Sequence, residues 1–225
     1  MKSLVITVLV DNPDSWIVPY VDALVEALRA PGHTVHSVQH QSEIKQGDVL
    51  FLLSCESIVP KETLSLNSHN LVIHESALPK GKGWSPLTWQ ILEGKNEIPI
   101  TLFEAVEKVD AGRIYFQDKM VFEGHELLQE LRAVQGLRTI ELCLRFIGCY
   151  PDVGGTEQEG DESFFPRRRA DDSRVEVGES ILELFNRLRV ADNVRYPVFF
   201  EHRGFRYVLR IEKAGRVPRG AVSQK

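Results

Sequence analysis

Residues 70–86 read NLVIHESALPKGKGWSP, and this stretch indicates both the fold and a candidate site. An apolar run ends at His74, and a loop rich in proline, glycine and lysine follows at once. Pro79, Gly81 and Gly83 favour tight turns, which expose backbone groups next to the imidazole. Two interpretations stay open. His74 is either a core histidine with a satisfied hydrogen bond, the commoner case, or a catalytic residue that a buried strand delivers to a site.

Other runs along the chain resemble the one before His74. Residues 3–10 (SLVITVLV) and 47–54 (GDVLFLLS) are almost wholly apolar, which is typical of strands buried on both faces. Residues 15–30 and 125–148 instead show the apolar spacing of amphipathic helices. This alternation predicts an α/β fold whose sheet is covered on both sides. Ligands of such sheets bind at the carboxyl ends of the strands, where His74 lies.

Shifts in composition predict how the chain is divided. Residues 1–150 form the predicted core, and residues 151–175, which are polar and heavily charged, form a predicted linker across the surface. Residues 176–213 predict a small C-terminal extension with a helix and a β-hairpin that turns at Arg203–Gly204. Residues 214–225 are expected to be a flexible tail.

The overall composition is that of a soluble globular protein, with 43% hydrophobic and 26% charged residues. The net charge of −5 argues against a broad nucleic-acid-binding surface. The three cysteines lack metal-binding spacing, as expected for reduced thiols, and no run approaches the ~18 apolar residues of a membrane span. We therefore expect a cytoplasmic protein with no bound metal and with neither nucleic acid nor membrane as a partner.

Asp110 is the candidate partner of His74. It lies in EKVDAGRIYFQ, residues 107–117, at a turn between two predicted strands. A carboxylate beside an imidazole can orient the ring and keep it basic. Sequence spacing alone does not show that the two side chains meet.

Two basic segments each have two interpretations. Lys80 and Lys82 either contact a charged substrate or belong to a solvated loop. The arginines at 167–169 either are balanced in solvent by Asp171 and Asp172 or contact the anion of a phosphorylated ligand.

Residues 72–117 resemble the formyl-tetrahydrofolate-dependent formyltransferases, which include enzymes acting on methionyl-tRNA, glycinamide ribonucleotide and sugars. The family pattern joins a strand ending in Asn-x-His-x-Ser-x-Leu-Pro and a glycine loop to a later Asp-x-Gly segment with a glutamine. The positions that match are His74, Ser76, Leu78, Pro79, Gly83, Asp110, Gly112 and Gln117. The resemblance implies a Rossmann-like core with a mostly parallel sheet. It also implies transfer of a formyl group from N10-formyltetrahydrofolate to a primary amine.

The resemblance assigns catalytic roles. His74 would transfer protons and stabilise charge, and Asp110 would orient it and raise its pKa. The family asparagine falls on Val72, so its oxyanion-binding role passes to Asn70, Ser76 or protonated His74, or the chain is an inactive homologue. Loss of one such donor typically costs about 10²–10³ in rate.

The resemblance also assigns a donor-binding loop. The segment that holds the pterin ring of the folate corresponds to residues 53–60, to which Val109 is added. The predicted folate-binding residues are therefore Leu53, Ser54, Cys55, Glu56, Ser57, Ile58, Val59, Pro60 and Val109.

The predicted acceptor is the amine of a nucleotide-linked amino sugar. Where glycinamide ribonucleotide enzymes carry a glycine-serine phosphate loop, this chain has DNPDSW, residues 11–16, which offers hydrogen bonds and a stacking face to a sugar ring. The segment after the predicted linker is short and the net charge is negative, which argues against tRNA. The predicted substrate-binding residues are Asp11, Asn12, Ser15, Trp16, Lys80, Lys82, Trp84 and Arg113.

Within the sugar enzymes, the run from His74 is similar to that of pseudaminic-acid pathways, which serve surface polysaccharide synthesis. The implied acceptor is a UDP-linked 4-amino-4,6-dideoxy sugar, such as an N-acetyl-altrosamine derivative. Since sugar-type relatives are often dimeric, we expect a homodimer. The alternatives are an enzyme like methionyl-tRNA formyltransferase and a catalytically degenerate module that binds folate or a sugar nucleotide.

Overall fold

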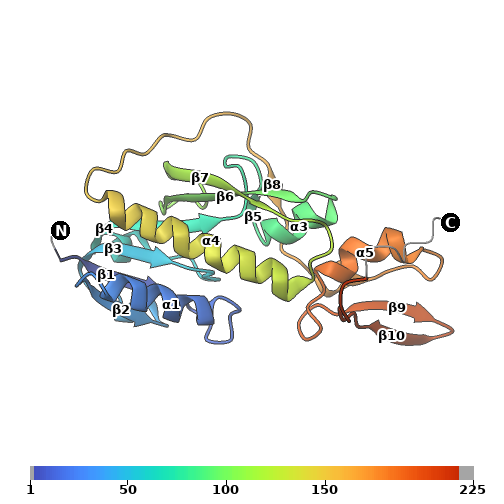
Figure 1. Cartoon of the computed structure of the whole chain (residues 1–225). Helices are drawn as coiled ribbons and strands as arrows, with labels where there is room; N and C mark the ends of the chain where they lie inside the picture. Colours follow the sequence, from blue (N-terminus) through green and yellow to red (C-terminus); the bar gives the residue numbers. More distant parts are fainter. Residues whose placement is uncertain (1–2, 218–225) are drawn as a thin grey trace.

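The computed structural model describes residues 3–217 and is built on one six-stranded sheet, whose order is β2-β1-β3-β4-β6-β7 (Figure 1). The first four strands in this order are parallel, and they are β2 (Thr34–Val38), β1 (Val5–Leu9), β3 (Gly47–Leu52) and β4 (Asn67–His74). Strands β6 (Glu97–Glu104) and β7 (Ile114–Val121) continue the sheet in antiparallel fashion. The predicted α/β class with a mostly parallel sheet is confirmed.

The apolar runs are explained by burial on both faces of the sheet. Ile6 and Val8 of β1 join the larger core cluster, whereas Leu9 joins a second cluster on the opposite face. Strand β3 alternates in the same way, with Phe51 in the larger cluster and Leu50 in the second. Because side chains alternate along a strand, a sheet covered on both sides gives nearly continuous apolar runs instead of an alternation of apolar and polar residues.

Two long helices lie side by side on one face of the sheet (Figure 1). Helix α1 (Val18–Arg29) buries Val21, Leu24, Val25 and Leu28, a stripe at helical spacing. Helix α4 (Leu128–Cys149) packs against it and against β6 and β7. The remaining core elements are short: η1 (Gln41–Glu43), α2 (Lys61–Leu64) and α3 (Pro86–Leu92).

After α4 the chain returns across the molecule toward the end of β4 (Figure 1). There β8 (Phe164–Phe165) pairs in parallel with β5 (Lys82–Gly83), and η2 (Ala170–Ser173) follows. A Cβ atom on Gly83, whose φ is +97°, would lie 2.4 Å from the carbonyl oxygen of Phe165, so this approach requires glycine. The segment predicted as a linker is thus tied to the core loop that follows His74.

The C-terminal extension consists of α5 (Ile181–Arg189) and the hairpin of β9 (Val198–His202) and β10 (Phe205–Leu209). The hairpin turns at Arg203 and Gly204, which have φ of +49° and +84°, as the sequence predicts. The extension has its own small core: Val175, Leu184, Leu188, Ala191 and Val198. Of the predicted tail, residues 214–217 contain no helix or strand, and residues 218–225 lie outside the described residues.

A buried arginine fastens the extension to the core. Arg189 is 2% exposed, and its guanidinium donates to the backbone and carboxylate oxygens of Glu126 and to the amide oxygen of Asn96. Within residues 3–217, no helix combines the length and the apolarity that a bilayer crossing needs.

Candidate functional site

A cleft of about 530 Å³ opens at the carboxyl ends of β3 and β4. Its apolar part is formed by the ends of these strands and by the loop after β3, and its polar part faces α4 and the C-terminal segments. The lining residues are Leu64 and residues within ranges 15–17, 52–59, 72–75, 83–88, 103–110, 128–139, 167–168 and 190–196. The cleft lies where ligands of open α/β sheets bind.

Backbone strain is concentrated at this cleft. Among the described residues, four that are not glycine have positive φ: Ser54 (54°), Ser85 (49°), Asp110 (52°) and Arg203 (49°). The first three line the cleft, whereas Arg203 belongs to the hairpin turn. Non-glycine residues in this region cost free energy and are found mainly at functional sites.

His74 ends β4 and lines the cleft, although it is only 7% exposed. Its Nε2 is 2.8 Å from the carbonyl oxygen of Gly81. Because a carbonyl oxygen can only accept, Nε2 carries the proton, and this bond fixes the ring orientation. The imidazole is thus a buried group with a satisfied hydrogen bond and also part of the cleft wall, and its catalytic role stays a prediction.

Asp110 lines the same cleft and accepts a hydrogen bond of 2.9 Å from the backbone N–H of Gly83. The turn behind it is crowded, because a Cβ atom on Gly112 would lie 1.8 Å from the carbonyl oxygen of Glu104. The Gln158 amide holds the turn by donating to the carbonyl oxygens of Asp110 and Gly112.

Asp110 and His74 form no direct hydrogen bond with each other. Each side chain instead binds one end of the same glycine turn, His74 at Gly81 and Asp110 at Gly83. The reason is geometric, because both side chains use backbone groups of the same turn as partners. His74 binds the carbonyl of Gly81, and Asp110 binds the N–H of Gly83.

The predicted folate-binding loop lines the cleft except for Pro60. Asp11 holds its backbone by accepting from the N–H groups of Glu56 (2.9 and 3.1 Å) and Ser57 (2.8 Å), and the Asn12 amide donates to the Glu56 carboxylate. Asp11 and Asn12 therefore lie behind this loop and not in the cleft wall, which corrects their prediction as substrate contacts. Ser15 and Trp16 do line the cleft.

The apolar side of the cleft suits a flat ring system. Ile58, Val106 and Val109 line it while 72%, 43% and 52% exposed, so they present apolar surface for a ligand to cover. Cys55 lies in the same wall, and burial, reinforced by the charge of Asp11, raises the pKa of its thiol to about 12. Cys55 is thus an uncharged thiol at neutral pH and not a nucleophile.

Two of the three candidate replacements for the family asparagine, Asn70 and Ser76, lie outside the cleft wall. Asn70 is 6% exposed and turns its amide toward the carbonyl oxygen of Leu64, to which it donates at 3.0 Å. Ser76 is 2% exposed and its hydroxyl has no partner within the described chain. Val72 itself lines the cleft. The side-chain amide of Asn70 does not reach the cleft wall, because it is bound to the carbonyl oxygen of the last residue of α2.

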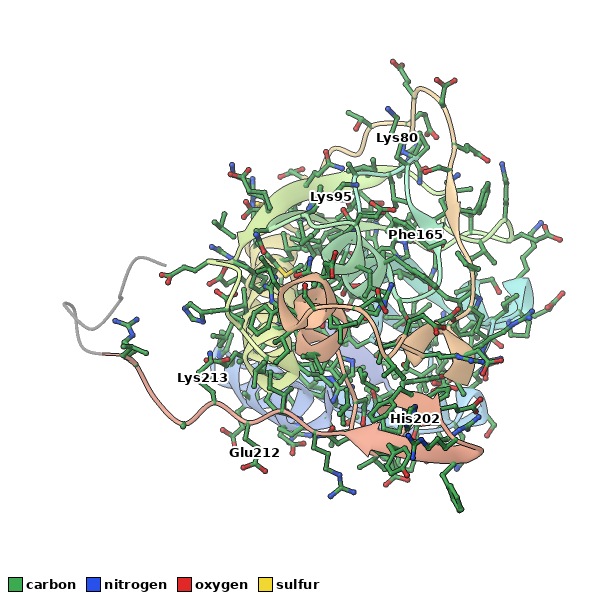
Figure 2. All side chains as sticks on the ribbon, turned by 90° about the vertical axis from the view of Figure 1, so that its right-hand side faces the viewer. Lys80, Lys95, Phe165, His202, Glu212 and Lys213 are labelled. Atoms are coloured by element: carbon green, nitrogen blue, oxygen red, sulfur yellow. The ribbon has the colours of Figure 1, made fainter. Side chains whose placement is uncertain are left out.

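Three predicted cationic contacts also lie elsewhere. Lys80 is exposed at the upper periphery in Figure 2. Lys82 is 1% exposed, and its ammonium group pairs with Glu162 at 2.7 Å. Arg113 pairs with Glu157 at 3.1 Å on the surface. Of the residues predicted in this loop, Trp84 is the one that lines the cleft.

Sequence reasoning missed most of the polar side of the cleft. Arg167 stacks on the Trp84 ring with 4.6 Å between guanidinium carbon and ring centroid, and Arg168 is 8% exposed against Tyr196. The arginine run at 167–169 was the available signal. Its first two residues line the cleft, and contact with a ligand anion stays a prediction. Other lining residues come from the extension and α4 without any local motif: Arg132, Asp192, Arg195 and Tyr196.

Glu75 is a second missed residue, although its place directly after His74 was a signal. It lines the cleft, and its carboxylate accepts a 2.7 Å hydrogen bond from the side-chain amide of Gln135 on α4. Desolvation raises the pKa of Glu75, while the charge of His74 lowers it and that of Asp110 raises it. The three groups therefore lie within electrostatic reach of one another.

Comparison with known proteins identifies the family. Residues 17–134, just over half of the 225 residues, match the family model described as formyl transferase. A methionyl-tRNA formyltransferase from Thermus thermophilus is 29% identical over 164 residues, which are 71% of this chain and 52% of that protein. The chain thus spans about half the length of the curated relatives it matches.

Solved structures share the fold at low sequence identity. A methionyl-tRNA formyltransferase from Clostridium thermocellum has a TM-score of 0.77 and 17% identity, with 94% of each chain covered. HypX from Aquifex aeolicus, in complex with tetrahydrofolic acid, has a TM-score of 0.74 and 17% identity over 93% of this chain and 38% of its own. A sugar N-formyltransferase from a Shewanella species has a TM-score of 0.66 and 14% identity over 92% and 97%. At such identities the likeness shows the fold alone.

Proposed function

The chain belongs to the formyl transferase family, enzymes of folate-dependent formyl transfer, and we propose that it formylates the primary amine of a nucleotide-linked amino sugar. The observation that carries this proposal is the chemistry of the polar side of the cleft. Trp16, Trp84 and Tyr196 line it together with Arg167 and Arg195. Aromatic faces stack on sugars and bases, and arginines bind phosphate groups, so a nucleotide sugar fits this combination.

The apolar side is the proposed place of N10-formyltetrahydrofolate, which supplies an activated formyl group when bound. Ser54, Cys55, Ser57 and Ile58 would hold its pterin ring with backbone groups of this loop, which Asp11 fixes from behind at Glu56 and Ser57. Val109 would cover the opposite side of the ring. HypX, which shares this fold, is described in complex with tetrahydrofolic acid, and this supports the assignment.

His74 and Asp110 are the proposed catalytic pair. His74 would give or take a proton near the folate nitrogen through the ring whose orientation Gly81 fixes. Asp110 would stabilise the positive charge that develops there, and it holds the Gly83 end of the turn. Since Val72 supplies no hydrogen bond, the developing oxyanion would depend on a protonated His74.

The proposal is tested by incubating the protein with N10-formyltetrahydrofolate and a panel of UDP- and dTDP-linked amino sugars. We expect one formylated nucleotide sugar, with a UDP-linked 4-amino-4,6-dideoxy sugar as the first acceptor to try. Release of tetrahydrofolate without any formylated sugar would overturn the sugar assignment.

Methionyl-tRNA is the second candidate acceptor, favoured by the 29% identity to the Thermus thermophilus enzyme. It is tested by formylation of charged initiator tRNA under the same conditions. The net charge of −5 favours the sugar, because a tRNA acceptor needs positive surface along its phosphate backbone.

Two narrower predictions are part of the proposal. The product would serve surface polysaccharide synthesis, and the active form would be a homodimer. Formation of a dimer is tested by sedimentation or light scattering of the purified protein.

A further inference from the structure

Glu75 holds a carboxylate in the cleft wall, and its hydrogen-bond partner there is the neutral amide of Gln135 rather than a lysine or arginine. Gln135 donates to Oε1, and within residues 3–217 no hydrogen bond to Oε2 is formed. No described lysine or arginine forms an ion pair with it. Arg132, one helical turn before Gln135 on α4, is already paired with Asp192 at 3.0 Å. One carboxylate oxygen of Glu75 is therefore left for a ligand.

Two buried glutamines fix Glu75 in this position. Gln90 of α3, 5% exposed, donates to the Glu75 carbonyl oxygen at 2.6 Å, and Gln135 of α4, 8% exposed, donates to the side chain at 2.7 Å. Holding a desolvated carboxylate in place is costly unless a cation or further donors compensate it. Such a group is prepared for a ligand that brings positive charge.

We propose that Glu75 is the residue that binds the amino group of the acceptor, with Gln135 as the residue that positions it. This proposal rests on the proposed function, because it requires an amine as acceptor. The ammonium group of the acceptor donates to Oε2 and supplies the missing positive charge. Transfer of one proton from nitrogen to the carboxylate then leaves a neutral amine, whose lone pair is free, and a neutral carboxyl group.

The neighbouring groups are consistent with this role. The titratable or charged groups around Glu75 are His74, which precedes it at the end of β4, Asp110 on the opposite loop, and Arg132 with Asp192 at the α4 side of the cleft. Desolvation makes Glu75 a stronger proton acceptor than an exposed carboxylate. The proton of the amine thus passes to Glu75, which leaves His74 for the folate nitrogen.

Steady-state kinetics with the acceptor that the wild-type protein formylates tests the role of Glu75. Glu75→Gln keeps the shape and the bond to Gln135 but removes the charge. We expect the acceptor KM to rise about 10-fold or more, since a hydrogen bond to a charged group is lost, while the KM for formyl-tetrahydrofolate stays unchanged. Glu141→Gln, on the exposed face of α4, is the matched control and leaves both constants unchanged.

The pH profile provides a second readout. In the wild-type protein, acceptor binding weakens as pH falls through the raised pKa of Glu75, because the protonated carboxyl no longer attracts the ammonium group. Glu75→Gln removes this acid limb, and Glu75→Asp restores it. An unchanged acceptor KM together with an unchanged acid limb in Glu75→Gln overturns the proposal.

Failure of the proposed function gives a different result. If the wild-type protein formylates methionyl-tRNA but no sugar, the sugar assignment is wrong. The role of Glu75 is then tested by the same kinetics with methionyl-tRNA as the acceptor. If neither acceptor is formylated, methylammonium chloride is titrated into ¹³C-labelled protein against sodium chloride of equal ionic strength. A selective shift of the Glu75 carboxyl carbon supports the ammonium site, and equal shifts in the two salts overturn it.

Discussion

His74 and Asp110 hold the two ends of one glycine turn. The His74 ring donates from Nε2 to the Gly81 carbonyl at 2.8 Å, and the Asp110 carboxylate accepts from the Gly83 N–H at 2.9 Å. The two side chains are 36 residues apart in sequence (110 minus 74) and line one cleft. A change at either side chain therefore acts on the other through this turn.

Replacing Asp110 with asparagine separates the charge of this residue from its structural role. The asparagine oxygen can still accept from Gly83, and asparagine tolerates the positive φ of 52°, so the fold is retained. We expect formyl transfer to fall by about 10²- to 10⁴-fold with little change in Tm. Activity within about twofold of the wild-type value would show that the carboxylate charge has no catalytic role.

His74→Asn is expected to cause a loss of the same order, because the amide cannot transfer a proton at neutral pH. His202→Asn is the control: His202 lies on the exposed hairpin, at the lower edge in Figure 2, and its replacement leaves the rate unchanged. Initial rates of tetrahydrofolate release measure both variants. Equal rates for the two variants would contradict the role of His74 and favour a binding module without catalysis.

Gly112→Ala is expected to destabilise the protein by about 2 kcal/mol or more, since the new Cβ would lie 1.8 Å from a backbone oxygen that cannot move freely. Gly148→Ala in α4 is the matched control. No atom lies within 4 Å of its added Cβ, and alanine is the better helix former, so stability rises by up to about 1 kcal/mol. Urea denaturation gives both free energies of unfolding, and equal effects at the two sites would contradict this assignment.

Asp11→Ala removes the acceptor that fixes the backbone of Glu56 and Ser57. We expect the Kd for tetrahydrofolate, measured by calorimetry, to rise about 10-fold, because the loop must be ordered on binding. Asp22→Ala on the exposed face of α1 should leave the Kd unchanged. A wild-type Kd in Asp11→Ala would place the folate outside this loop.

The ion pair between the buried Lys82 and the more exposed Glu162 predicts a pH-dependent stability. The hydrogen bond from Lys82 lowers the pKa of Glu162. The contribution of the ion pair to stability is therefore complete above the ordinary pKa of 4.5, and it is lost as pH falls through the lowered pKa of the folded state. Glu162→Gln should therefore lower Tm at pH 7, and the difference from wild type should shrink below about pH 4. A Tm difference that is constant with pH would mean that the pair does not stabilise the fold.

Local patterns in the sequence predicted the fold, whereas they did not predict much of the candidate site. The runs that form β1 and β3 show no alternation of apolar and polar residues because both faces of the sheet are buried, and the turn at Arg203 and Gly204 follows from local backbone preference. The apolar runs also predicted where strands end, and so they predicted that His74 lies at the end of a strand.

The polar side of the cleft depends on tertiary contacts that no local pattern encodes. Arg167 reaches the cleft because β8 pairs with β5, and Gln135 reaches Glu75 because α4 packs across the sheet. Lys82 reads as a surface cation until the partner Glu162, 80 residues later, is placed beside it. Pairings between distant segments decide which charged side chains reach the ligand.

The most direct measurement is a competition for a single labelled formyl group. The protein is given formyl-tetrahydrofolate labelled with ¹³C in the formyl group, together with a UDP-linked 4-amino-4,6-dideoxy sugar and charged initiator tRNA. Mass spectrometry then follows the label in both acceptors. The account predicts label on the sugar amine and its loss in His74→Asn; label on the tRNA alone, or on neither acceptor, would contradict it.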